Sequence, residues 1–213
     1  MFAVLFMLVV GGPEASACGN EAKWRVVGWT GDGAKALIRS EHNDDEGQIH
    51  QLNLYLLSKS GVEKKWDILT VKDNSDQSVR SRRWKAAEPE IAAAGIKLDP
   101  SRPPLVGETE GGGCLDGDLV SIPDKPYSLM FDTHRETDSM SRMLYDLLVV
   151  TGETKKSVRV LFGDYGYGGM GFCVGSYWTD PANNSVVVVP GYGSEMALVP
   201  MTEIEAALAA PPL

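Results

Sequence analysis

The stretch Val27-Gly28-Trp29-Thr30-Gly31-Asp32-Gly33 decides the fold class, because an aromatic-ended apolar run leads directly into a turn signal. Residues 24–29 are typical of a short strand, and glycines on either side of an aspartate mark a tight connection. Residues 34–39 then return as an apolar partner. The sequence therefore predicts an opening β-hairpin.

A second hairpin is predicted immediately after the first. Residues 42–47 form a polar, acidic loop, and residues 49–58 alternate well enough for a strand. Residues 59–63 turn, and residues 65–71 return. The first third of the chain is thus expected to be a four-stranded meander.

Residues 75–95 are predicted to be helical, because they are rich in alanine and end at Gly95, a residue suited to a helix C-terminus. Pro89 interrupts the pattern, so we expect a kink or two short helices. The segment also contains a basic run, which indicates a solvated helix face, with an anion-binding patch as the alternative. The run consists of Arg80, Arg82, Arg83 and Lys85.

The β pattern resumes after an irregular connection rich in proline and glycine, residues 99–117. A short C-terminal helix is expected to start at Thr202, since Thr202 and Glu205 have capping-box spacing and Ile204 and Leu208 form an apolar stripe. Between the connection and this helix, strands are predicted at residues 127–132, 143–151, 157–162, 172–179, 185–189 and 195–200.

Two segments repeat one pattern, an aromatic-ended strand followed by an aspartate-containing turn and an apolar return strand. They begin at Trp29-Thr30-Gly31-Asp32-Gly33 and at Trp178-Thr179-Asp180-Pro181. Propeller blades contain such hairpins, but a propeller needs the repeat throughout the chain. We therefore expect a mainly β fold with minor α. Antiparallel hairpins and meanders would form a sandwich or propeller-like arrangement, with one Ala-rich helix mid-chain and a short C-terminal helix.

Residues 1–17 have the features of a signal segment. The apolar run 2–10 is too short to cross a bilayer as a helix, and Ala15-Ser16-Ala17 is a small-residue cleavage pattern. Because no Lys or Arg precedes the run, a buried strand of the mature fold is the alternative. The predicted organisation is a signal segment, residues 1–17, and a single β-rich domain, residues 18–213.

Three cysteines are present, and an oxidising compartment favours pairing two of them. We expect a disulfide between Cys114 and Cys173, with unpaired buried thiols as the alternative. It would close a loop of roughly 60 residues, for which chain entropy gives about 4 kcal/mol. Cys18 follows the cleavage pattern and is a weaker candidate for acylation, because Ala15 occupies the position where lipoprotein signals normally have leucine.

The formal net charge is −9, from 20 basic and 29 acidic residues. Such a chain repels phosphate backbones and anionic lipid head groups. Nucleic acid is therefore excluded as an expected partner, and membrane contact is expected only if Cys18 is acylated.

The sequence Gly166-Tyr167-Gly168-Gly169-Met170-Gly171 satisfies G-x-G-x-x-G, but strand-like residues follow it. A dinucleotide site needs that loop to open a helix, so no nucleotide is expected. Aromatic residues around this Gly/Tyr loop are the candidate contacts for a ligand or partner, because rigid rings bury area at low entropic cost. Core packing is the alternative. The candidates are Tyr165, Tyr167, Phe172, Tyr177 and Trp178.

Chemistry-bearing residues elsewhere give weaker hypotheses. Asp44, Asp45 and Glu46 could hold a calcium ion between two histidines, although a solvated turn is favoured because calcium-loop spacing is absent. His134, in a polar segment, would serve a small periplasmic hydrolase, but no G-x-S-x-G elbow accompanies it. No catalytic set and no cofactor is predicted.

The order of these features resembles a bacterial family of predicted secreted proteins of unknown function. The resemblance rests on the hairpin at residues 27–33, the acidic loop before residues 49–57, Ala94-Gly95-Ile96 and the hairpin at residues 176–189. It implies export and a β-rich fold, and it carries no catalytic residue. We therefore expect an exported, periplasmic or extracellular, non-enzymatic protein that binds an envelope protein or a small ligand.

Overall fold

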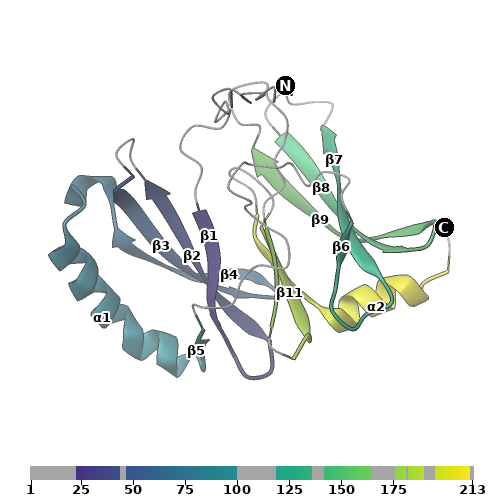
Figure 1. Cartoon of the computed structure of the whole chain (residues 1–213), viewed down its shortest axis with the longest axis horizontal. Coiled ribbons are helices and arrows are strands. Elements are labelled where there is room, and N and C mark those ends of the chain that lie inside the picture. Colours follow the sequence, from purple (N-terminus) through teal and green to yellow (C-terminus); the bar gives the residue numbers. More distant parts are fainter. Residues whose placement is uncertain are drawn as a thin grey trace, which may run out of the picture.

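A computed structural model describes residues 23–43, 47–99, 119–135, 142–164, 176–180, 182–189 and 195–211. These residues form antiparallel sheets of five, three and four strands and two α-helices. In Figure 1 the layers follow one another as helix α1, the five-stranded sheet, the three-stranded sheet, and the four-stranded sheet with helix α2. Each neighbouring pair of layers shares a buried apolar core. The predicted mainly β fold is confirmed, with open sheets stacked as in a sandwich.

The five-stranded sheet contains the predicted meander. It runs β1 (Lys23–Trp29), β2 (Lys35–Asn43), β3 (Ile49–Ser58) and β4 (Gly61–Leu69), and β3 has the predicted bounds. A short strand that the sequence did not predict, β5 (Lys97–Leu98), pairs with the other edge of β1. Only glycine fits at position 28 of β1, because a Cβ there would lie 2.7 Å from the carbonyl oxygen of Lys97. A single glycine thus lets the chain return beside its first strand.

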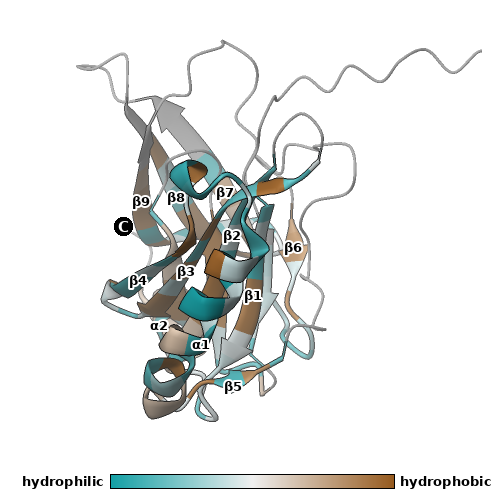
Figure 2. Ribbon diagram, turned by 90° about the vertical axis from the view of Figure 1, so that its left-hand side faces the viewer, coloured by the Kyte–Doolittle hydropathy of each residue, from teal (hydrophilic) through white to brown (hydrophobic). Residues whose placement is uncertain are grey.

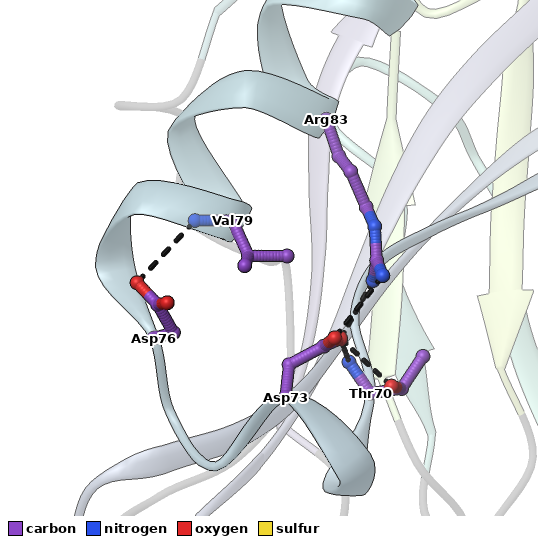
Figure 3. Close-up of polar contacts among 5 residues, drawn as sticks. All are labelled: Thr70, Asp73, Asp76, Val79 and Arg83. Carbon is purple, nitrogen blue, oxygen red and sulfur yellow. Dashed lines mark hydrogen bonds and ion pairs between the residues drawn. The ribbon is translucent and has the colours of Figure 1, made fainter.

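The chain enters α1 through a compact polar junction (Figure 3). After the short 3-10 helix Val71–Asp73, the carboxylate of Asp73 accepts hydrogen bonds from the backbone and hydroxyl of Thr70, each at 2.7 Å, and from both terminal nitrogens of Arg83. These bonds, that from the Thr70 hydroxyl above all, lower the pKa of Asp73 to about 2. Asp76 then caps the helix by accepting from the backbone of Ser78 and Val79.

Helix α1 (Gln77–Ala93) covers one side of the five-stranded sheet. It is one helix rather than two short ones, so that part of the prediction is wrong. Pro89 removes a single backbone donor, whereas Ala87 and Ile91, on either side of it, are buried against the sheet. Gly95, with φ +75°, ends the helix as predicted. Much of α1 is coloured hydrophilic in Figure 2, and the strands beside it show both hydrophilic and hydrophobic stretches.

The remaining strands form two sheets. The four-stranded sheet contains β6 (Val120–Ser121), β7 (Ser128–Arg135), β8 (Arg142–Thr151) and β9 (Thr154–Asp164), in that order. The three-stranded sheet contains β10 (Ser176–Thr179), β11 (Ser185–Val189) and β12 (Ala197–Pro200). Each of the strands predicted in this region has a counterpart, and β11 has the predicted bounds.

The three-stranded sheet lies inside the molecule and is buried on both faces. All five residues of β11 are buried, and its valines alternate between two cores. Val186 and Val188 pack toward the four-stranded sheet, while Val187 and Val189 pack toward the five-stranded sheet. An uninterrupted valine run is the sequence signature of a strand with no solvent-exposed face. Burying each valine contributes on the order of 2 kcal/mol.

Helix α2 (Met201–Ala209) begins one residue before the predicted start, and the predicted capping box is wrong. Pro200 is the N-cap residue, which places Thr202 inside the first turn. The start is fixed by Met201, whose side chain is buried and whose backbone N–H donates to Asn184 at 2.8 Å. The predicted apolar stripe is present, since Ile204 is fully buried and Leu208 packs against the same core.

Candidate ligand-binding site

The two hairpins that repeat one sequence pattern touch each other at their turns. The Asp180 carboxylate, almost fully buried, accepts backbone hydrogen bonds from Ala182, Asn184 and Ser185. The hydroxyl of Ser185 in turn donates to the carbonyl oxygen of Gly33 at 2.7 Å. These contacts join the five-stranded and three-stranded sheets at one end, so the aspartate turns have a structural role.

Beyond that end, the face of the five-stranded sheet that looks toward the three-stranded sheet becomes polar. We call this face the inner face. Near the turns it presents Trp29, Ala36, Ile38 and Leu57 to the core shared with β11. One register step farther from the turns, Trp24, Ser40, Asn53 and Asp67 stand side by side across β1 to β4. A polar row thus follows directly on an apolar core, on the same face of the same strands.

Two oxygens in this row are buried without a hydrogen-bond partner. Ser40 is 1% exposed and Asn53 is 2% exposed. Neither Oγ of Ser40 nor Oδ1 of Asn53 has a partner among the residues that the structure describes, although the side chain of Asn53 also forms a hydrogen bond with Tyr55. Buried polar atoms in native proteins are nearly always satisfied, and leaving one unpaired costs about 1–3 kcal/mol. Ser40 and Asn53 pair in register between β2 and β3, so two such oxygens lie side by side, and we take this pair as the candidate site.

Aromatic rings lie beside these oxygens. The rings of Trp24 and Tyr55 are 5.8 Å apart. Both are half-buried against the apolar core between the five-stranded and three-stranded sheets, which we call the inner-face core. The ammonium of Lys65 lies 5.9 Å from the Tyr55 ring centre and forms an ion pair with Asp67 at 2.8 Å. Burial raises the pKa of Tyr55, and the hydrogen bond with Asp67 raises the pKa of Lys65. We call the group Trp24, Ser40, Asn53, Tyr55, Lys65 and Asp67 the inner-face cluster.

The aromatic candidates predicted from the sequence are only partly described. Tyr177 is fully buried with its ring 5.4 Å from Phe131, and Trp178 is 2% exposed in the inner-face core. Core packing thus accounts for the position of these two rings. Tyr165, Tyr167 and Phe172 lie outside the described residues. The segment that carries them joins β9 to Ser176, which pairs with Val189 at the end of β10 away from the Asp180 turn.

The structure describes the positions of the histidines but not those of the acidic loop residues or the cysteines. The rings of His42 and His50 are 6.4 Å apart, and His134 lies in β7 opposite Leu144. Asp44, Asp45, Glu46 and the cysteines Cys18, Cys114 and Cys173 lie outside the described residues, as does segment 1–17. Within the described ranges, no group of three or more His, Cys, Asp or Glu side chains is arranged to hold a metal ion.

The inner-face cluster was not predicted from the sequence. In β3, buried leucines at 52, 54 and 56 point to α1, while Asn53 and Tyr55 occupy the opposite face. A polar residue at a position that should meet another sheet is the signal that could have indicated the site. The signal gains meaning only once the register places Asn53 beside Ser40.

Helices in the described ranges are too short or too polar to cross a membrane. Comparison of the chain with known proteins returned no matching family model, no matching characterised protein and no matching solved structure.

Proposed function

We propose that this chain is an exported, non-enzymatic binding protein whose inner-face cluster holds a small uncharged ligand rich in hydroxyl groups, such as a saccharide. The observation that carries the proposal is a pair of buried oxygens, on Ser40 and Asn53, that have no hydrogen-bond partner among the described residues and lie beside half-buried aromatic rings.

Hydrogen-bonding capacity indicates a ligand that donates. Oδ1 of Asn53 can only accept, and Oγ of Ser40 can accept while donating elsewhere. Ligand hydroxyl groups would supply the missing donors and relieve the desolvation cost of both oxygens. A ligand without donors would leave that cost in place, so the cluster would discriminate against it.

Ring geometry and charge narrow the class further. Trp24 and Tyr55 offer apolar faces against which the C–H side of a sugar ring can pack. The only charges in the cluster, on Lys65 and Asp67, neutralise each other. An ionic ligand would have to compete with that pair, whereas a neutral one leaves it intact.

The proposal is tested by titrating the purified exported protein with neutral mono- and oligosaccharides while following tryptophan fluorescence. We expect saturable binding, and Ser40→Ala should weaken it by about tenfold, because one ligand hydrogen bond is lost. Ser58→Ala is the matched control, because Ser58 is also buried but its Oγ accepts from the backbone of Ser60. The proposal fails if no neutral saccharide binds, or if Ser40→Ala and Trp24→Ala both leave the affinity unchanged.

Export is part of the same proposal. It is supported by the apolar run, the Ala15-Ser16-Ala17 pattern and cysteines that an oxidising compartment would pair. Mass spectrometry of the mature protein should give the mass of residues 18–213 less two hydrogens, as expected for a Cys114–Cys173 disulfide. Retention of Met1 would contradict export. An added acyl mass would instead identify Cys18 as a lipid anchor.

A further inference from the structure

Two arginines stand directly opposite each other on the helix-facing side of the five-stranded sheet. Arg25 of β1 pairs in register with Arg39 of β2. Both positions alternate with buried residues that face α1, Val27 and Leu37. Like charges at directly opposite positions destabilise a sheet. Arg25 is exposed and Arg39 is partly buried, so the charge of Arg39 is the one that water compensates least.

A third arginine approaches the pair from the helix. Residues Trp84, Ala87, Ile91 and Ala94 make the stripe of α1 that packs on the sheet. Arg80 precedes Trp84 by four residues and so belongs to the same stripe. The C-terminal end of α1 leads to β5, which pairs with Gly28 and Trp29, so the first turns of α1 lie toward the opposite end of the sheet (Figure 1). The strand register places Arg25 and Arg39 toward that opposite end.

The four residues of the basic run on α1 therefore have different surroundings. Arg83 is bound by Asp73, and Arg82 and Lys85 are exposed. Burial lowers the pKa of Arg39, and the charges of Arg80 and Arg25 lower it further. Arg80 is therefore the residue of the basic run whose charge reaches Arg39.

Two described acidic residues lie near the three arginines, Asp76 at the N-cap of α1 and Glu41 in β2, so cations outnumber acids here. Glu41 forms an ion pair with Arg39, but Lys23 stands opposite Glu41 on β1 and adds another cation. Nε of Arg39 is buried and has no acceptor among the described residues. Oε1 of Glu41, in the ion pair with Arg39, is also buried without a further hydrogen-bond partner in the described part of the chain, so what remains is a local excess of positive charge on a chain whose net charge is −9.

We propose that Arg25, Arg39 and Arg80 form a binding site for an oxyanion, a phosphate or carboxylate group, between the first turns of α1 and the sheet. Planar guanidinium groups match the oxygen pairs of such groups and form strong charge-assisted hydrogen bonds with them. The bound anion offsets the repulsion between Arg25 and Arg39 and accepts from Nε of Arg39. This site is independent of the proposed saccharide site, because the two lie on opposite faces of the same sheet.

The test is calorimetric titration of the full mature chain with inorganic phosphate at low ionic strength. We expect saturable binding at one site per chain, which Arg39→Gln weakens by about tenfold or more. Arg82→Gln, an exposed change of equal charge on the same helix, should leave the affinity within about twofold. Arg25→Gln gives the same readout should Arg39→Gln fail to fold. Absence of phosphate binding, or equal losses in Arg39→Gln and Arg82→Gln, overturns the site.

Two further arms identify the source of the anion. One uses vesicles with phosphate-containing anionic head groups, added with and without free phosphate, to ask whether the same arginines bind a lipid head group. Vesicle binding that is displaced by free phosphate supports the site. A chain with Asp44→Asn, Asp45→Asn and Glu46→Gln tests the acidic segment next to β2 in sequence. If only this chain binds phosphate, that segment is the natural counter-charge and the proposal is wrong.

Discussion

At the scale of single residues, a comparison of Ser40 with Ser58 distinguishes a binding role from a structural role. Both are buried in the five-stranded sheet, but within the described part of the chain only the hydroxyl oxygen of Ser58 accepts a hydrogen bond. Ser40→Ala should therefore raise the free energy of unfolding by about 1 kcal/mol, whereas Ser58→Ala should lower it by a similar amount. Urea denaturation of both variants without ligand measures this. Loss of stability in Ser40→Ala would mean that its hydroxyl is satisfied in the free protein.

Asp73 gives the residue-scale prediction for pH. Its pKa is about 2 in the folded protein, against 3.8 for the unperturbed group, because Thr70 and Arg83 stabilise the carboxylate. Its contribution to stability is therefore complete above pH 4 and is lost as the pH falls through about 2. Asp73→Asn should lower the melting temperature at pH 5 to 7, with a difference that shrinks toward pH 2. Glu88→Gln, an exposed change of equal charge on α1, should show no such convergence.

At the scale of elements, the sequence predicted the strands and helix ends that are determined by residues within the same segment. β3 and β11 were predicted with their bounds, since one alternates and the other is a β-branched run. The end of α1 followed from Gly95. The start of α2 and the existence of β5 did not follow, because Asn184 and Gly28, each distant in the chain, decide them. The inner-face cluster was not predicted for the same reason, because only the register between strands brings its residues together.

The docking of β5 gives the prediction at this scale. Gly28→Ala would bring a Cβ to 2.7 Å from both Ile96 Cγ2 and the Lys97 carbonyl oxygen, so β5 must move away from β1. We expect a loss of about 1–3 kcal/mol in the free energy of unfolding, as for other overpacked positions. Gly31→Ala is the control, since the nearest atom to its added Cβ is 4.0 Å away. Denaturant titration compares the two, and equal effects would show that β5 does not depend on Gly28.

At the scale of the whole molecule, the three-stranded sheet determines whether the layers unfold together. Its faces supply opposite cores: Val187 packs with the five-stranded sheet, and Val188 packs with the four-stranded sheet. Removing β11 would open the core that each outer sheet shares with the three-stranded sheet, whereas the core between α1 and the five-stranded sheet contains no residue of β11. We therefore expect one cooperative transition, in keeping with the prediction of a single domain over residues 18–213.

The tryptophans make this expectation measurable. All five lie in the cores that involve the five-stranded sheet, namely Trp24, Trp29, Trp66, Trp84 and Trp178. Tryptophan fluorescence therefore reports on that half of the molecule, whereas far-ultraviolet circular dichroism reports on all the sheets. Val188→Ala creates its cavity in the other core, yet it should shift the fluorescence transition as far as Val187→Ala does, by about 2 kcal/mol each. If Val188→Ala moves the dichroism transition and leaves the fluorescence transition in place, the two halves unfold separately and the single-domain prediction is wrong.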